Sequence, residues 1–190
     1  MRQLFHNATL VNVDEGTVEP GRLAVRDGRF VDIDAINDGE HWEPVDCEGA
    51  YLSPGFVDLH GSLTCWDQDG KSAVAGGFTT VALAANIGRP VDSVDLLKAT
   101  QASGQKSACV VIVPGALTVG LGGKELAEMG MMARAGASFM SQGVGLLSST
   151  IVLQRAFEYA ERLGLTVFVR GGDLELESGG VVKAGPWAVI

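Results

Sequence analysis

The chain has 190 residues, of which 46% are hydrophobic, and its 23 acidic and 14 basic residues give a formal net charge of −9. This length and composition predict one folded domain with a sizeable core, alone or with a small appendage. The acidic excess argues against a surface for nucleic acid or anionic membranes, which needs clustered lysine and arginine. Small molecules or proteins are therefore the expected partners.

Neither a targeting signal nor a membrane span stands out in the sequence. It lacks a basic start followed by an apolar run, and no apolar stretch approaches the ~20 residues that cross a bilayer. Cys47, Cys65 and Cys109 are odd in number and form no CxxC pair, so free thiols are expected rather than disulfides or a structural zinc site. These features predict a soluble, cytoplasmic protein.

The first part of the chain is rich in β-branched and apolar residues. Residues 4–13 and 22–33 are predicted to form strands, and Asp27-Gly28 within the second run is a strong hairpin-turn signal. A small antiparallel sheet is the expected result.

Apolar strands then alternate with helices, which is the signature of parallel βα units, and this pattern divides the chain into domains at 1–53 and 54–190. Residues 56–59 are predicted to form a short buried strand, with His60 projecting from its carboxyl end, where barrel enzymes place catalytic groups. Further strands are predicted at 79–83, 108–113, 137–140 and 166–170. Helices are predicted at 92–103, capped by Asp92, at 124–135, and at 151–163, ended by Gly164.

The number of predicted strands is too small for a closed barrel. A (β/α)₈ barrel needs eight strands and typically about 250 residues, whereas about five strands are predicted here. We therefore expect either that the chain is a piece of a longer protein, or that a half-barrel buries its open edge against another molecule, because an unpaired apolar edge invites association.

Three stretches carry a resemblance to a known family. They are Pro-Gly-Phe-Val-Asp-Leu-His at 54–60, Ala-Gly-Gly-Phe-Thr-Thr-Val at 75–81, and Pro-Gly-Ala-Leu-Thr at 114–118 with Gly120-Leu121 and residues 125–130. Together they resemble the dihydroorotases of the amidohydrolase superfamily, in particular the bacterial class I type that works alongside aspartate carbamoyltransferase. Residues 155–160 continue the similarity in register. The resemblance implies a small N-terminal β-sandwich segment over 1–53 and, over 54–190, the first part of a TIM-type barrel.

The family's chemistry is the reversible hydrolysis of a cyclic amide by a metal-bound hydroxide, and zinc serves because it lowers the pKa of bound water to about 7. The resemblance places the paired histidines of the first barrel strand at His60 and Ser62, so that one ligand is kept and one is lost. The arginine that grips the substrate carboxylate corresponds to Thr64, which cannot form a bidentate cationic contact. The loop at 65–71 is also shorter than in the family.

The later family positions depart further from a metal centre. The asparagine that contacts substrate is retained as Asn86, the aspartates after the fourth strand correspond to Gln142 and Gly143, and the histidine after the fifth strand corresponds to Arg170. A catalytic zinc normally has about three protein ligands, and a guanidinium at this place opposes a divalent cation. His60 and Asn86 are therefore predicted to be vestigial.

The resemblance with these substitutions predicts a non-catalytic protein without a cofactor, whose role is structural. Some bacteria carry an inactive dihydroorotase-like chain that associates with the catalytic chain of aspartate carbamoyltransferase and is needed for its assembly, and this is the predicted partner; a homo-oligomer is a further expectation. Two alternatives stay open: an active zinc-dependent dihydroorotase or related cyclic amidohydrolase, and a fragment without independent function.

Overall fold

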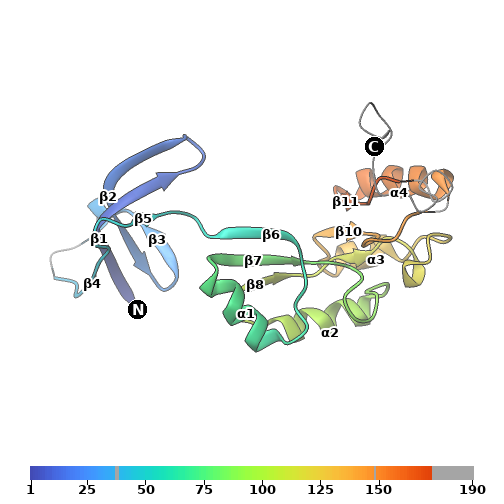
Figure 1. Cartoon of the computed structure of the whole chain (residues 1–190), viewed down its shortest axis with the longest axis horizontal. Coiled ribbons are helices and arrows are strands. Elements are labelled where there is room, and N and C mark those ends of the chain that lie inside the picture. Colours follow the sequence, from blue (N-terminus) through green and yellow to red (C-terminus); the bar gives the residue numbers. More distant parts are fainter. Residues whose placement is uncertain (37–38, 148, 173–190) are drawn as a thin grey trace, which may run out of the picture. The chain divides into compact units, whose positions relative to one another are not determined.

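The structure is a computed structural model that describes residues 1–36, 39–147 and 149–172. The chain divides into two compact units, Met1–Gly55 and Phe56–Ile190, which are described separately below. Figure 1 shows the first unit in blue and the second from cyan-green to red. Within the described residues, no helix combines the length and the apolar character needed to cross a membrane.

The first unit is a single sheet built around one long strand. It contains β1 (Arg2–Asn12), β2 (Thr17–Arg26), β3 (Arg29–Val31), a short 3-10 helix (Ile33–Ala35), β4 (Glu43–Asp46) and β5 (Tyr51–Leu52). The strands β1, β2 and β3 pair antiparallel, as predicted. The predicted hairpin turn is confirmed, because Asp27 and Gly28 have the positive φ values of 52° and 76° that such a turn requires. Two strands that were not predicted, β4 and β5, pair parallel with β1.

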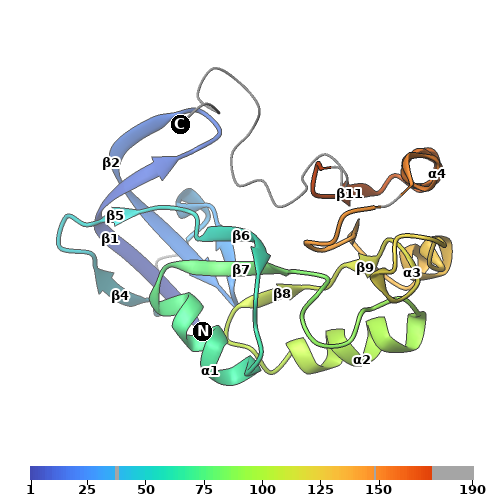
Figure 2. The same cartoon turned by 45° about the vertical axis from the view of Figure 1, so that its right-hand side comes forward.

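The second unit alternates strands and helices. Its elements are β6 (Phe56–Gly61), α1 (Trp66–Ala75), β7 (Phe78–Leu83), α2 (Val94–Gly104), β8 (Val110–Ile112), β9 (Gly115–Ala116), a 3-10 turn (Val119–Leu121), α3 (Met129–Arg134), β10 (Phe139–Ser141), α4 (Thr150–Leu163) and β11 (Thr166–Phe168). They form two parallel sheets, ordered β6-β7-β8 and β9-β10-β11. Only Val113 and Pro114 separate β8 from β9 along the chain. Figure 2 shows α1 and α2 lying along the same side of the first of these sheets.

The predicted strands and the last predicted helix are confirmed, with bounds that differ by a few residues. Helix α4 has an amphipathic pattern that buries Ala156 and Ala160, and Gly164 ends it in the left-handed conformation with φ of 65°. Ser149 caps its first turn by accepting a hydrogen bond from the backbone of Val152. These features depend on local sequence, which is why the sequence predicts them well.

Three predictions about helices are wrong. The 65–71 segment is not a loop, because most of it forms the start of α1, where Gly70 packs directly against Ser107 and Ala108. The helix predicted at 124–135 is shorter, since backbone hydrogen bonds from Val119 to Glu125 and from Ala127 to Leu117 hold the chain before α3 in an extended form. Asp92 does not cap α2, which begins after Ser93; its carboxylate accepts a hydrogen bond from Gly120 N instead.

The strand β6 is much more exposed than predicted. Phe56, Val57 and Leu59 are 60%, 53% and 58% exposed. This strand also lies at the edge of its sheet, where among the described residues β7 alone pairs with it. The apolar sequence signals a strand that can be covered on both faces, but the described part of this unit leaves those side chains open.

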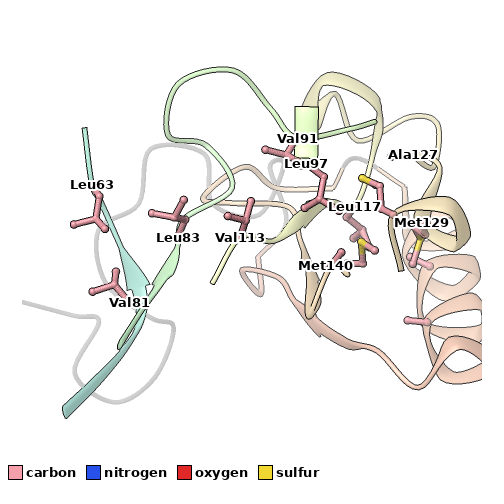
Figure 3. Packing of buried hydrophobic residues seen from close by; sticks show 14 of the residues in the cluster. Leu63, Val81, Leu83, Val91, Leu97, Val113, Leu117, Ala127, Met129 and Met140 are labelled. Carbon is pink, nitrogen blue, oxygen red and sulfur yellow. The ribbon is translucent and has the colours of Figure 1, made fainter. Parts of the chain in front are cut away.

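The core of the second unit lies between its parallel strands and its helices. Leu83, Leu97, Leu117, Met132 and Met140 belong to one buried cluster, which reaches α4 through Ala156 and Ala160. Figure 3 shows the labelled members of this cluster following one another from Leu63 and Leu83 through Leu117 to Met129. The predicted site residues lie at or just after the ends of the strands of this unit.

Candidate functional site at the carboxyl ends of the parallel strands

The predicted site residues all occur at or just after the carboxyl ends of strands. His60 is in the last part of β6 and Ser62 follows it, Asn86 follows β7, Gln142 and Gly143 follow β10, and Arg170 follows β11. Carboxyl ends of neighbouring parallel strands meet at one edge of a sheet, which is where α/β proteins place ligand sites. The exposure and the contacts of each residue decide which ligands this edge of the sheet can bind.

His60 and Ser62 are both exposed. The backbone N–H of His60 donates a hydrogen bond of 2.9 Å to Oδ1 of Asp58, a half-buried residue of the same strand. Asp58 therefore accepts a hydrogen bond from the backbone within its own strand. The residue that follows β7, Ala84, donates a backbone hydrogen bond of 2.9 Å from its N–H to the carbonyl oxygen of Gly61 at the end of β6. The ends of β6 and β7 are therefore firmly joined, with one imidazole at this edge.

The structure brings Asn86 and Gly143 together. A methyl group added at Gly143 would lie 3.0 Å from both Cβ and Oδ1 of the Asn86 side chain. Gly143 also has a φ of +66°, a conformation that side chains with a Cβ rarely adopt. Glycine at position 143 thus permits a tight approach between the segments that follow β7 and β10.

Gln142 is buried, with 1% of its surface exposed, and both the oxygen and the nitrogen of its amide form hydrogen bonds. Thr118 Oγ1 donates to Gln142 Oε1 at 2.8 Å, and Gln142 Nε2 donates to the carbonyl of Leu121 at 2.8 Å. Gly123 N in turn donates to Thr118 Oγ1 at 2.9 Å. This set of bonds, which we call the Gln142 network, ties the glycine-rich turn at 120–123 to the end of β10.

Sequence reasoning missed two residues of this region. Thr118 was part of a family motif, but no role was predicted for it, although a buried threonine beside a glycine-rich turn is a common acceptor for the turn's N–H groups. The other is Asp69, whose Oδ2 accepts hydrogen bonds from Thr64 N and Cys65 N, each at 2.7 Å, and from Thr64 Oγ1 at 3.2 Å. Both the backbone and the hydroxyl group of Thr64 are therefore bound to the first turn of α1.

Asp69→Asn is expected to destabilise the protein at neutral pH and to have little effect in acid. Backbone hydrogen bonds from Cys65 and then Thr64 lower the pKa of Asp69 from its ordinary 3.8. A lowered pKa means that the carboxylate stabilises the fold fully above pH 3.8, and that this contribution is lost as the pH falls through the lower pKa of the folded state. Urea unfolding of both proteins, at neutral pH and well below pH 3.8, measures the difference.

The matched control for this prediction is Asp67→Asn in the same turn of α1. Asp67 forms an exposed ion pair of 2.8 Å with Lys71, and such pairs contribute little. Its substitution should change the urea midpoint much less than Asp69→Asn does at neutral pH. An Asp69→Asn effect of equal size at both pH values would contradict the prediction.

The donor set at this edge does not fit a catalytic zinc ion. The predicted positions offer the His60 imidazole, the Ser62 hydroxyl, an already engaged Gln142 amide, Gly143 without a side chain, and the Arg170 cation. Over residues 1–36, 39–147 and 149–172, no group of three or more His, Cys, Asp or Glu side chains is placed to hold a metal. A zinc site needs several deprotonated N, S or O ligands converging on one point, so the described residues supply no complete centre.

Comparison with known proteins decides the family. No family model matches the chain. A dihydroorotase from Pelotomaculum thermopropionicum is 32% identical over 97% of this chain and 45% of its own length. A dihydroorotase from Mycobacterium tuberculosis is 38% identical over 76% of this chain and 36% of its own length. The chain belongs to the dihydroorotase family. It spans less than half of the length of these curated dihydroorotases, and about 45% in several of them.

This dihydroorotase-family chain also shares its fold with solved structures of hydantoinases. The L-hydantoinase (dihydropyrimidinase) from Arthrobacter aurescens has a TM-score of 0.76 at 19% identity, covering 94% of this chain and 43% of the hydantoinase. A dihydropyrimidinase from Brevibacillus agri has a TM-score of 0.71 at 17% identity, and the match covers 94% of this chain and 42% of the dihydropyrimidinase. At these identities the likeness concerns the fold alone.

Proposed function

We propose that this dihydroorotase-family chain is non-catalytic and that its role is structural, in the assembly of aspartate carbamoyltransferase for pyrimidine biosynthesis. The observation that carries the non-catalytic part is the burial of Gln142. Its amide takes the place of a family carboxylate, and both its oxygen and its nitrogen are committed to Thr118 and Leu121. A neutral amide whose oxygen and nitrogen are both hydrogen-bonded neither ligates zinc nor takes up a proton near neutral pH.

The second unit is, in this proposal, the first part of a (β/α)₈ barrel, and the first unit is the N-terminal β-sandwich segment. Support comes from the run of parallel strands β6, β7, β8 with β9, β10 and β11, with α1 to α4 between them. The apparent break between the two parallel sheets consists of Val113 and Pro114, so β8 and β9 act as one interrupted strand. Proline lacks the N–H that a continuous ladder would need at this point.

The proposed partner is the catalytic chain of aspartate carbamoyltransferase, and the exposed apolar residues of β6 support a role in binding a protein. Phe56, Val57 and Leu59 present an uncovered strand, a type of surface that associates with other chains. Co-expression with the cognate catalytic chain, followed by size-exclusion chromatography at micromolar concentration, tests the proposal. Co-elution is expected, whereas two separate peaks would overturn it.

Two exposed substitutions sharpen this experiment. Leu59→Asp places a charge on the exposed strand and should abolish co-elution, because burying an unpaired charge is strongly unfavourable. Met131→Asp is the matched control, since Met131 on α3 is about as exposed and lies outside β6. If both variants lose co-elution, or if neither does, the exposed residues of β6 do not form the binding surface for the catalytic chain.

The alternative function is an active zinc-dependent cyclic amidohydrolase, which is favoured by the name dihydroorotase borne by the curated relatives. Elemental analysis of the dialysed protein discriminates between the two. The non-catalytic proposal expects zinc far below one ion per chain. Stoichiometric zinc that survives dialysis and is lost in His60→Ala would instead establish the hydrolase. A chain that shows no protected amides in hydrogen exchange would support the third possibility, a fragment without independent function.

A further inference from the structure

The second unit contains a cavity of about 310 Å³ that is lined by Thr64 but by none of the predicted metal-ligand positions. It is enclosed by the segments that follow β6, β7 and β8 and by the helices α1 and α2. Neither His60, Ser62, Asn86 nor Gln142 lines it. Its volume is at the lower end of the range for small-molecule sites, so it suits a compact ligand of fragment size.

The floor of this cavity is apolar and rigid. Leu63, Leu83, Val91 and Val113 line it, and each is less than a tenth exposed because it belongs to the buried cluster. Figure 3 shows Leu63, Leu83 and Val113 side by side at the end of the cluster nearest β6, with Val91 close to Leu97. Because these side chains are fixed by their own packing, the floor is preformed, and a ligand would not have to order it.

The rim of the cavity is polar and positively charged. Among the described residues that line it, Arg89 is the one that carries a charge, and none of the ion pairs formed by the described residues involves it. Thr64 also reaches the rim, and its hydroxyl already donates to Asp69, which leaves its oxygen free to accept but not to donate. The exposed guanidinium of Arg89 therefore supplies the donors, in a planar arrangement that suits a carboxylate.

We propose that this cavity binds a small carboxylic acid with an apolar body. The carboxylate meets the guanidinium of Arg89 at the rim, and the apolar body lies on Leu63, Leu83 and Val113. Such a ligand contacts both the floor and the rim of the cavity. An inorganic anion would leave the apolar floor in contact with water, and a neutral apolar molecule would leave Arg89 without a charged partner. Since the cavity does not use the residues that replace the family's metal ligands, this binding does not depend on whether the chain is catalytic.

Benzoate is the probe for this site, and benzamide is its neutral match in shape. Benzoate is titrated into the full chain, and binding is measured by isothermal calorimetry and by the fluorescence emission of Trp66, which lines the cavity. The expected Kd for benzoate is on the order of 1 mM. Benzamide should bind at least about tenfold more weakly, because it lacks the charge-assisted bond to Arg89. The emission change should disappear in Trp66→Phe, which assigns the signal to this cavity.

Arg89→Gln is the decisive variant, and Arg162→Gln is its matched control. Arg89 is exposed in a loop and Arg162 is exposed on α4, so both variants should fold, and both change the net charge equally. Benzoate affinity should fall at least about tenfold in Arg89→Gln and stay unchanged in Arg162→Gln. Equal affinity in Arg89→Gln and the parent protein, equal binding of benzoate and benzamide, competition by inorganic phosphate at benzoate's own concentration, or no binding at about 10 mM would each overturn the proposal.

Discussion

Gln142→Ala is expected to lower the free energy of unfolding by about 2–4 kcal/mol. The substitution removes both hydrogen bonds of a side chain that is 1% exposed, and it leaves the Thr118 hydroxyl and the Leu121 carbonyl without their partner. Unsatisfied buried groups of this kind are among the most costly single changes. The measurement is urea unfolding at neutral pH, followed by circular dichroism.

Two further variants test the physical reason. Gln154→Ala removes an exposed glutamine of α4 whose amide bonds to Glu158, and it should change the free energy of unfolding by no more than about 0.5 kcal/mol. Gln142→Glu keeps the shape but turns the donor toward Leu121 into an acceptor, so it should be destabilising at neutral pH and recover as acid protonates the carboxyl. If Gln142→Ala costs no more than Gln154→Ala, the Gln142 network does not hold this edge.

Leu97→Ala is expected to lower the free energy of unfolding by about 2–5 kcal/mol. Leu97 is fully buried in the first half of α2 and belongs to the cluster that attaches this helix to the strands (Figure 3). Truncating it loses the transfer free energy of the removed atoms and leaves a cavity in a well-packed core. Urea unfolding monitored by circular dichroism measures the loss.

The matched control is Leu59→Ala on β6, which truncates the same side chain where it is 58% exposed. Its effect in the isolated chain should stay within about 0.5 kcal/mol. A loss at Leu59 as large as the loss at Leu97 would mean that β6 is covered in solution, which would contradict the exposed strand described above. The comparison therefore also tests whether β6 is available for a partner.

Much of the fold follows from the sequence because its signals are local. The Asp27-Gly28 turn, the order of strands and helices in the second unit, and the amphipathic α4 ended by Gly164 each depend on residues close together in the chain. The start of α1 was missed for the opposite reason. Gly70 weakens a helix by its intrinsic propensity, and the reason it stands there is that Ser107 and Ala108 leave no room for a side chain.

The candidate site was also predictable from the sequence only in part. By itself the sequence determined the family, the order of the parallel units, and the identity of each residue that follows a strand, because a motif is a contiguous stretch of chain. Only the tertiary structure decided that Gln142 is buried between Thr118 and Leu121, that Asn86 lies against Gly143, and that β6 is left uncovered. Burial and contact depend on which distant segments share a space, and no pattern within a single stretch records that.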